Sequence, residues 1–274
     1  MHRYELADRH WELIRSLFPA RSRGRPWRDH RTLVNAVLWV LFSGAPWRDL
    51  PERYGPWQTA YRRFARWRRD GTWDRALARL RLRADRAGLL DYAQWNVDST
   101  SVRATRHAAG ARRPGKEKGL AAHEPADHAL GRCRGGFGTK LHLAVDAGGL
   151  PLAFLLTCGN RNECPMFEPL VAAARRARPR RGLPRRLAAD KGYASGRVRA
   201  WLARRRVEAV IPPRRTETQH PCDRRAYRRR NVVERCVGRL KECRRVATRY
   251  EKLAVNFGAM VTLAMTVIYL RLPL

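Results

Sequence analysis

KLHLAVDAGGLPLAFLLT, residues 140–157, is the stretch from which the fold class of the larger part of the chain follows. Its two halves, Lys140 to Asp146 and Leu152 to Thr157, are mostly apolar runs of strand length. Ala147-Gly148-Gly149 between them is typical of a hairpin turn, because glycine accepts the backbone angles that tight turns require. The stretch therefore predicts two antiparallel strands, and we assign Asp146 at the turn to structure rather than to chemistry.

Strands and helices continue on both sides of this hairpin. Before it, Trp95 to Val102 is expected to form a strand. After it, the expected elements are a helix over 166–178, a strand over 186–190, a helix over 196–206, a strand over 208–211 and a long helix over 226–248. Three strands followed by alternating helices and strands predict an α/β fold, a mixed sheet with helices on its faces, which is the ribonuclease H-like arrangement.

The chain is expected to divide near residue 90, into a helical domain over 1–90 and the α/β domain over 91–274. Residues 103–138, between the first predicted strand and the hairpin, are rich in glycine, alanine, arginine and histidine, and we expect a long, mobile, basic loop. Leu253 to Leu270 is apolar and reaches membrane-spanning length, but polar residues dilute it. We therefore expect a buried closing helix and no membrane partner.

Two helices of the first ninety residues suggest a DNA-binding module. The run from Leu33 to Leu41 has the apolar spacing of a core helix, and Trp57 to Arg69 is expected to form the next. On this second helix Arg62, Arg66 and Arg69 share one face. Two helices joined by a tight turn, the second of them basic, favour a helix-turn-helix-like domain. An ordinary helical bundle with a solvated arginine face fits the same spacing.

The charge balance points to a polyanionic partner. Lysine and arginine number 58 against 24 acidic residues, which gives a net charge of +34. A field this positive favours nucleic acid. A GC-rich genome would explain arginine in place of lysine, but not the shortage of acids. The six cysteines include no CxxC pair, which disfavours a zinc ribbon. The N-terminus shows no apolar signal segment, so we expect a cytoplasmic, nucleoid-associated protein.

Polar residues form a stripe on the last long predicted helix. Tyr227, Arg230, Glu234 and Lys241 are spaced 3, 4 and 7 residues apart, so about 100° per residue brings all four onto one narrow strip. The adjoining arc is apolar and would dock on the sheet; its members are Val233, Cys236, Val237 and Leu240. Taken alone, this geometry favours simple pairing of Arg230 with Glu234 on a helix surface.

The same four residues match a motif of a known family at every spacing. The bacterial insertion-sequence DDE transposases carry a third catalytic motif of Tyr, two residues, Arg, three residues, Glu, six residues and Lys. The chain resembles this group, within the superfamily that joins the fourth and fifth insertion-sequence families, and is most similar to the fifth. Other matching stretches are Trp47–Pro51, Val97–Thr100, Arg134–His142, Ala189–Tyr193 and Ile211–Arg214.

The resemblance implies that Asp98, Asp190 and Glu234 are the catalytic carboxylates. It also implies two Mg²⁺ ions, with Mn²⁺ as a substitute. The chemistry agrees with three acids, because two ions about 3.5–4 Å apart stabilise the attacking and leaving oxygens of a displacement at phosphorus. Mg²⁺ prefers hard oxygen ligands, and no histidine-rich or thiolate set competes for that role.

The resemblance further implies that Tyr227, Arg230 and Lys241 contact DNA. The expected activity is that of a transposase, which binds the terminal inverted repeats of its own element, cleaves the ends and transfers 3′-hydroxyl ends to target DNA. Double-stranded DNA is thus the expected partner, with a homodimer in the synaptic complex.

Two other functions remain open at the level of sequence. One is a stand-alone nuclease on the same fold, against which the helical N-terminal module argues. The other is a non-catalytic DNA-binding protein, such as a decayed or domesticated transposase, against which the three intact acids argue. Glu163, in a loop after Asn160, Arg161 and Asn162, could contact metal or DNA.

Overall fold

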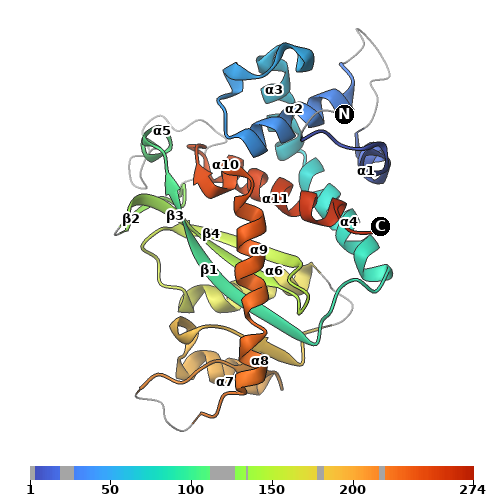
Figure 1. Cartoon of the computed structure of the whole chain (residues 1–274). Coiled ribbons are helices and arrows are strands. Elements are labelled where there is room, and N and C mark those ends of the chain that lie inside the picture. Colours follow the sequence, from blue (N-terminus) through green and yellow to red (C-terminus); the bar gives the residue numbers. More distant parts are fainter. Residues whose placement is uncertain (1–3, 19–27, 112–126, 134, 178–181, 216–219) are drawn as a thin grey trace. The chain divides into compact units, whose positions relative to one another are not determined.

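The computed structural model describes residues 4–18, 28–111, 127–133, 135–177, 182–215 and 220–274. By contacts, the described residues fall into two units, which are taken one at a time below (Figure 1). The first comprises the described parts of Met1–Ala87, Thr105–Ala126 and Leu240–Leu274, and the second those of Gly88–Ala104 and Asp127–Arg239. The expected basic loop over 103–138 lies partly outside the described residues.

The first unit is helical, as expected for the N-terminal region. Its elements are α1 (Asp8–Ile14), η1 (Arg15–Leu17), α2 (His30–Ser43), η2 (Trp47–Asp49), η3 (Glu52–Tyr54), α3 (Trp57–Arg69), α4 (Thr72–Arg86), α5 (Arg106–Ala109), α10 (Arg244–Ala247), β7 (Thr248–Arg249) and α11 (Ala254–Leu270). The apolar run from Leu33 to Leu41 is buried in α2, which confirms the predicted core helix. Asp29 caps α2 by accepting a hydrogen bond from the Thr32 N–H at 2.8 Å.

The tight turn of the N-terminal region lies one connection later than expected. Gly44 to Pro56, which includes η2 and η3, separates α2 from α3. Only Asp70 and Gly71 separate α3 from α4. Gly71 has φ 75°, a left-handed conformation that glycine adopts at little cost, and Asp70 accepts a hydrogen bond from the Thr72 N–H at 3.0 Å. The predicted helix-turn-helix is therefore corrected: α3 and α4, not α2 and α3, are joined tightly.

The closing helix α11 is buried as predicted. Most of its residues are buried, and it packs against α4, α2, α3 and α10 of the same unit. A helix that is apolar on every side is stable only when surrounded in this way. Within the described ranges, no helix is both long and apolar enough to cross a membrane.

The second unit is built on a mixed sheet. Its elements are β1 (Gln94–Ala104), β2 (Gly131–Cys133), β3 (Gly136–Val145), β4 (Pro151–Cys158), η4 (Cys164–Met166), α6 (Phe167–Arg176), β5 (Arg186–Ala188), η5 (Lys191–Tyr193), α7 (Gly196–Arg204), β6 (Glu208–Val210), α8 (Arg224–Arg228) and α9 (Asn231–Lys241), the last two residues of which fall in the first unit. The strands run in the order β4-β3-β1-β5-β6, and β2 also pairs with β3. β3 runs antiparallel to both β4 and β1, whereas β5 and β6 run parallel to β1. This confirms the ribonuclease H-like arrangement.

Asp146 holds the β3–β4 hairpin together. Its side chain is fully buried, and its two oxygens accept hydrogen bonds from the N–H groups of Leu150, at 2.6 Å, and Asp91, at 2.8 Å. Burial raises the pKa of Asp146 to about 6, against the opposing effect of these hydrogen bonds. The structural assignment of this aspartate is therefore confirmed by its contacts.

The predicted long helix over 226–248 is wrong as a single element. It is divided into α8, α9 and α10, with breaks at Arg229–Arg230 and at Glu242–Cys243. At the first break the Arg230 N–H bonds the carbonyl of Tyr227 at 2.9 Å, three residues back, which tightens the chain. At the second, Cys243 takes an extended conformation (ψ 106°) with its side chain buried. Neither break contains glycine or proline, so the local sequence gave no sign of them.

Candidate carboxylate site

Asp98 and Asp190 reach the same level on neighbouring parallel strands. β1 and β5 pair in register up to Asn96 and Ala188, and each aspartate follows two residues later. Asp190 has extended backbone angles, φ −77° and ψ 177°, so the alternation of side chains continues past the end of β5. Both carboxylates are therefore expected on one side of the sheet, where both are half-buried.

Arg230 joins Asp98 to Glu234. Its Nη1 lies 2.8 Å from Asp98 Oδ2, and its Nη2 lies 2.6 Å from Glu234 Oε1. The Arg230 side chain is 12% exposed, whereas that of Glu234 is 59% exposed. Tyr227 lies beside this pair, with its ring centre 5.7 Å from Arg230 Cζ. The structure thus brings together four of the residues singled out in the sequence, through one shared guanidinium group.

Glu163 is the residue whose place the sequence did not predict. Its Oε1 accepts hydrogen bonds from Ser99 Oγ at 2.7 Å and from Lys140 Nζ at 3.1 Å. Ser99 directly follows Asp98 on β1, so Glu163 lies beside the first aspartate. These partners are 64 and 23 residues away along the chain, which is why no local pattern could identify the contact.

Negative charge is concentrated around Asp190. Burial raises the pKa of Asp190, and the charges of Asp98 and Glu163 raise it further. For Glu163, burial alone would raise the pKa, but the hydrogen bonds from Ser99 and Lys140 outweigh burial and lower it. The repulsion felt by Asp190 is therefore not fully balanced by the chain, and it favours an added cation.

Tyr193 places an unpartnered hydroxyl beside these acids. Its side chain is fully buried, and its hydroxyl has no hydrogen-bond partner among the described residues. Burial raises the pKa of Tyr193, and the charges of Glu163, Asp98 and Asp190 raise it further. A buried polar group without a partner costs about 1–3 kcal/mol, so a water or ligand that accepted the hydrogen bond of this hydroxyl would be stabilised here.

The donor set fits a divalent ion in its chemistry. Carboxylate oxygens and a hydroxyl are the hard donors that Mg²⁺ prefers, and repulsion at Asp190 is relieved by positive charge. Within the described part of the chain, no three acidic, histidine or cysteine side chains converge closely enough to hold a metal by themselves. The Arg230 guanidinium accounts for this at Asp98 and Glu234, because it takes the place of a cation between them.

The remaining predicted residues lie in the first unit. Arg62, Arg66 and Arg69 are exposed on α3, opposite its buried residues Phe64 and Trp67, so their shared face is solvent-directed. Lys241, the last residue of α9, is half-buried, and burial lowers its pKa. Their roles toward DNA stay predictions.

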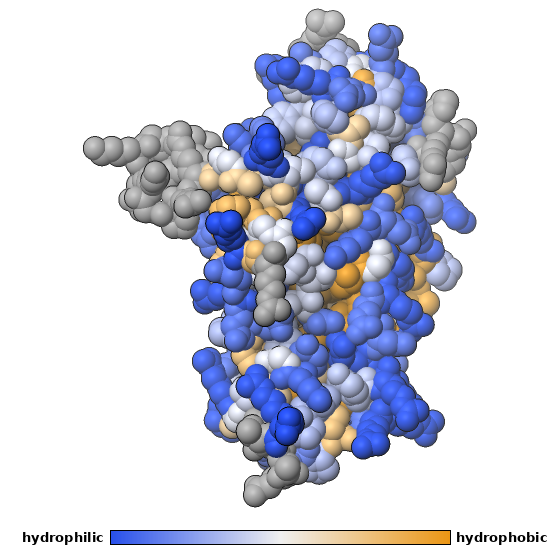
Figure 2. All heavy atoms as spheres, turned by 60° about the vertical axis from the view of Figure 1, so that its left-hand side comes forward, coloured by the Kyte–Doolittle hydropathy of each residue, from blue (hydrophilic) through white to orange (hydrophobic). Residues whose placement is uncertain are grey.

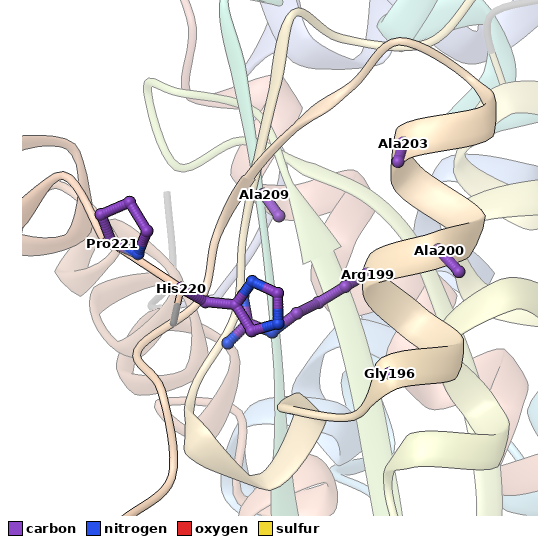
Figure 3. Close-up of a pocket in the computed structure, with 7 residues that line it drawn as sticks. All are labelled: Gly196, Arg199, Ala200, Ala203, Ala209, His220 and Pro221. Atoms are coloured by element: carbon purple, nitrogen blue, oxygen red, sulfur yellow. The ribbon is translucent and has the colours of Figure 1, made fainter. Parts of the chain in front are cut away.

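A separate hollow of about 470 Å³ lies between α7 and the segment after β6. Figure 3 shows the Arg199 side chain reaching from α7 toward His220, with Ala200, Ala203 and Ala209 in the surrounding wall. None of the acids described above lines it.

Two families of known proteins match the chain. The family described as "Transposase DDE domain" matches residues 96–269, and the family described as "Putative transposase of IS4/5 family" matches residues 6–77. Together these matches reach from the first helix nearly to the end of α11. The first covers more than half of the chain and includes every element that carries an acid of the site.

Similar proteins come from several bacteria. A "Putative transposase for insertion sequence element IS6501" of Brucella ovis is 35% identical over 48% of this chain and 98% of the relative. A "Putative transposase for insertion sequence element IS402" of Burkholderia cepacia is 41% identical over 46% of this chain and 60% of the relative. An uncharacterised protein of Sinorhizobium fredii is 44% identical over 39% of this chain and 83% of the relative.

Solved structures give weaker likeness. The paired-end complex of Mos1 transposase with the left transposon end is 15% identical, over 85% of this chain and 83% of that chain, with a TM-score of 0.28. A pre-cleavage Mos1 transpososome is 13% identical, over 81% and 82%, with a TM-score of 0.29.

Proposed function

This chain belongs to the family of transposases with a DDE domain, and from that premise we propose that Asp98, Asp190 and Glu234 are its catalytic carboxylates. A transposase of this family cleaves DNA and transfers the cut ends with the help of a divalent metal ion. The proposal assigns that chemistry to the acids on β1, at the end of β5 and on α9.

The observation that carries the proposal is the bridge made by Arg230. One guanidinium group contacts Asp98 at 2.8 Å and Glu234 at 2.6 Å, although these acids come from different elements. Asp190 joins them through the register of β1 and β5. An isolated helix-surface pair would have tied Arg230 to Glu234 alone. The link to a half-buried aspartate on the sheet supports a site instead.

Each residue of the site then has a task. Asp98, Asp190 and Glu234 would hold two Mg²⁺ ions, or Mn²⁺ in their place. When bound, such ions stabilise the attacking and leaving oxygens of the displacement at phosphorus. Arg230, once released from the acids, offers a planar guanidinium group that suits a phosphate. The Tyr227 ring, whose centre lies 5.7 Å from Arg230 Cζ, would restrict where the guanidinium group can move. Lys241 is proposed as a second phosphate contact.

The DNA partners are part of the same proposal. The chain would bind the terminal inverted repeats of its own element, cleave its ends and join the 3′-hydroxyl ends to target DNA as a homodimer in a synaptic complex. The exposed arginine face of α3 would contact the repeats. We propose that the chain acts in the bacterial cytoplasm, on the DNA of the nucleoid.

Glu234→Gln tests the site directly. The substitution keeps side-chain size but removes the charge that metal coordination needs. We expect a folded protein with near-normal repeat binding and with strand cleavage lowered by several orders of magnitude. Circular dichroism checks the fold, and cleavage of a terminal-repeat duplex in Mg²⁺ gives the rate.

The matched control is Glu242→Gln, an exposed glutamate just past α9 whose ion pair among the described residues is with Arg271 at 3.4 Å. It should cleave at the parent rate. If Glu234 is merely a helix-surface partner of Arg230, Glu234→Gln should cost at most about 0.5 kcal/mol of stability and leave cleavage intact. That outcome would refute the site.

A further inference from the structure

We propose that Glu163 is a fourth carboxylate of the active site, and that it holds the divalent ion together with Asp98 and Asp190 in the chain free of DNA. This inference rests on the proposed function, because it takes the two aspartates as metal ligands. It adds a residue from the segment between β4 and α6.

The Glu163 side chain is fixed by donors from two strands. Its Oε1 receives the Ser99 hydroxyl of β1 at 2.7 Å and the Lys140 ammonium group of β3 at 3.1 Å. The main chain is fixed as well, since the Glu163 carbonyl accepts the Met166 N–H at 2.9 Å. With Oε1 occupied by these donors, the side chain is held in place, and Oε2 is the oxygen left for another partner.

Gly192 shows where Oε2 lies. A Cβ atom added at Gly192 would come within 2.6 Å of Glu163 Oε2 and 3.0 Å of Asp190 Oδ1, so both oxygens occupy the space beside this glycine. The Gly192 N–H also donates to Asp190 Oδ1 at 2.9 Å. Gly192 does not have a positive φ, so its backbone angles do not require glycine. The requirement comes from the two carboxylates.

Tyr193 gives independent support for a ligand at this place. Its hydroxyl is fully buried and has no hydrogen-bond partner among the residues that the structure describes. It lies in the field of Glu163, Asp98 and Asp190. Protein-bound Mg²⁺ keeps several of its waters, and such a water would accept the hydrogen bond that the phenol cannot make within the chain.

Before DNA binds, the Glu234 side chain is less firmly held beside Asp98 and Asp190 than the Glu163 side chain. Its side chain is 59% exposed, and its Oε1 is taken by Arg230. The side chain of Glu163 is 25% exposed and is held by two donors. Glu163 is therefore the better fixed of the two glutamates, and the cluster with Asp98 and Asp190 is completed once Arg230 leaves Asp98 for the entering ion.

The simplest competing role for Glu163 is an ion-pair partner of Lys140. The two roles differ in their effect on metal affinity. If Glu163 serves Lys140 alone, its removal lowers stability and leaves metal affinity unchanged. If Glu163 also serves the metal, its removal lowers metal affinity as well.

Mn²⁺ binding to the full chain without DNA, measured by calorimetry, tests the proposal. Glu163→Gln should weaken Mn²⁺ binding by about 10–100-fold. Asp98→Asn should abolish it. Glu168→Gln is the matched control, because it removes the same charge on neighbouring α6, where Glu168 pairs with Arg197 at 3.0 Å outside the site. It should bind as the parent does.

Thermal unfolding of the same proteins gives the second readout. In chelator, Glu163→Gln should melt below the parent, because Lys140 loses its charged partner, and the rise in melting temperature caused by Mn²⁺ should be smaller than in the parent. Parent-like Mn²⁺ affinity in Glu163→Gln, with Asp98→Asn inactive in binding, would overturn this inference alone. Parent-like affinity in Asp98→Asn, or a parent chain that binds no Mn²⁺, would remove the aspartate site as well and the inference with it.

Discussion

Asp98 and Asp146 have the same side chain, but their surroundings give Asp146 a structural role and leave Asp98 able to bind a metal ion. Both oxygens of Asp146 accept backbone N–H groups, from Leu150 and Asp91, inside the protein. Asp98 accepts the Ser99 N–H at 2.8 Å with one oxygen and contacts the Arg230 side chain with the other. A backbone donor cannot leave without unfolding the turn. A side chain can move away, so only Asp98 can exchange its partner for a metal ion.

Asp146→Asn should therefore lower stability and spare the chemistry. The amide group of asparagine can accept only one of the two backbone N–H groups, which leaves the other buried without a partner. We expect a loss of about 1–3 kcal/mol in the free energy of unfolding, measured with denaturant. Mg²⁺-dependent cleavage by the folded protein should remain. Asp98→Asn should show the converse, and a well-folded Asp146→Asn protein without cleavage would contradict the assignment.

How much of the site is predictable from sequence differs between residues. The resemblance to a family singled out Asp98, Asp190 and Glu234, and the register of β1 with β5 explains how the two aspartates reach one level. For Glu163 the sequence indicated only a loop residue that could contact metal or DNA, without placing it beside Asp98. Its contacts join β1, β3 and the segment before α6, and such long-range contacts leave no spacing in the sequence.

At the scale of elements, α3 was predictable and the helix after β6 was not. α3 spans Trp57–Arg69, with the bounds expected from the sequence. The helix expected over 226–248 is broken twice without glycine or proline. Part of the predicted polar stripe is nevertheless present, because the side chains of Arg230 and Glu234 form an ion pair at 2.6 Å across the start of α9.

The arginine face of α3 is the element to test for repeat recognition. Because Arg62, Arg66 and Arg69 are exposed, replacing all three with alanine should leave helicity unchanged. We expect weaker binding of a terminal-repeat duplex in electrophoretic or anisotropy assays. If each arginine contacts a phosphate, the slope of log affinity against log salt should fall by about 3.

Arg83→Ala combined with Arg86→Ala is the control, since both are exposed arginines of α4. An equal loss of repeat binding in the control would mean that positive charge alone determines the affinity and that α3 does not recognise the repeat. The full chain is required for the comparison. A fragment beginning at residue 91 would lack α4 and α2, against which the apolar helix α11 packs.

At the scale of the whole molecule, charge is the dominant feature. The chain carries +34, and hydrophilic side chains cover much of the visible face in Figure 2, with smaller apolar areas between them. A field of this size attracts DNA of any sequence and speeds the encounter. It carries no information about which DNA is cut. Affinity and chemistry should therefore respond to different solution conditions.

Changes of salt and of metal ion should separate DNA binding from DNA cleavage. Each phosphate contact releases counterions, so a protein with 6–10 such contacts loses roughly 10³–10⁵ in affinity between 50 and 200 mM salt. We expect a loss of this order for the full chain on a terminal-repeat duplex, measured in chelator so that Mg²⁺ does not compete for the phosphates. Cleavage should require Mg²⁺ or Mn²⁺ and stop in excess chelator, because the acids act through the ion. The decisive measurement pairs a salt titration of binding with a metal titration of cleavage on one preparation. A flat salt response would show that the positive field does not bind DNA, and full cleavage in chelator would remove the metal site while leaving the binding result intact.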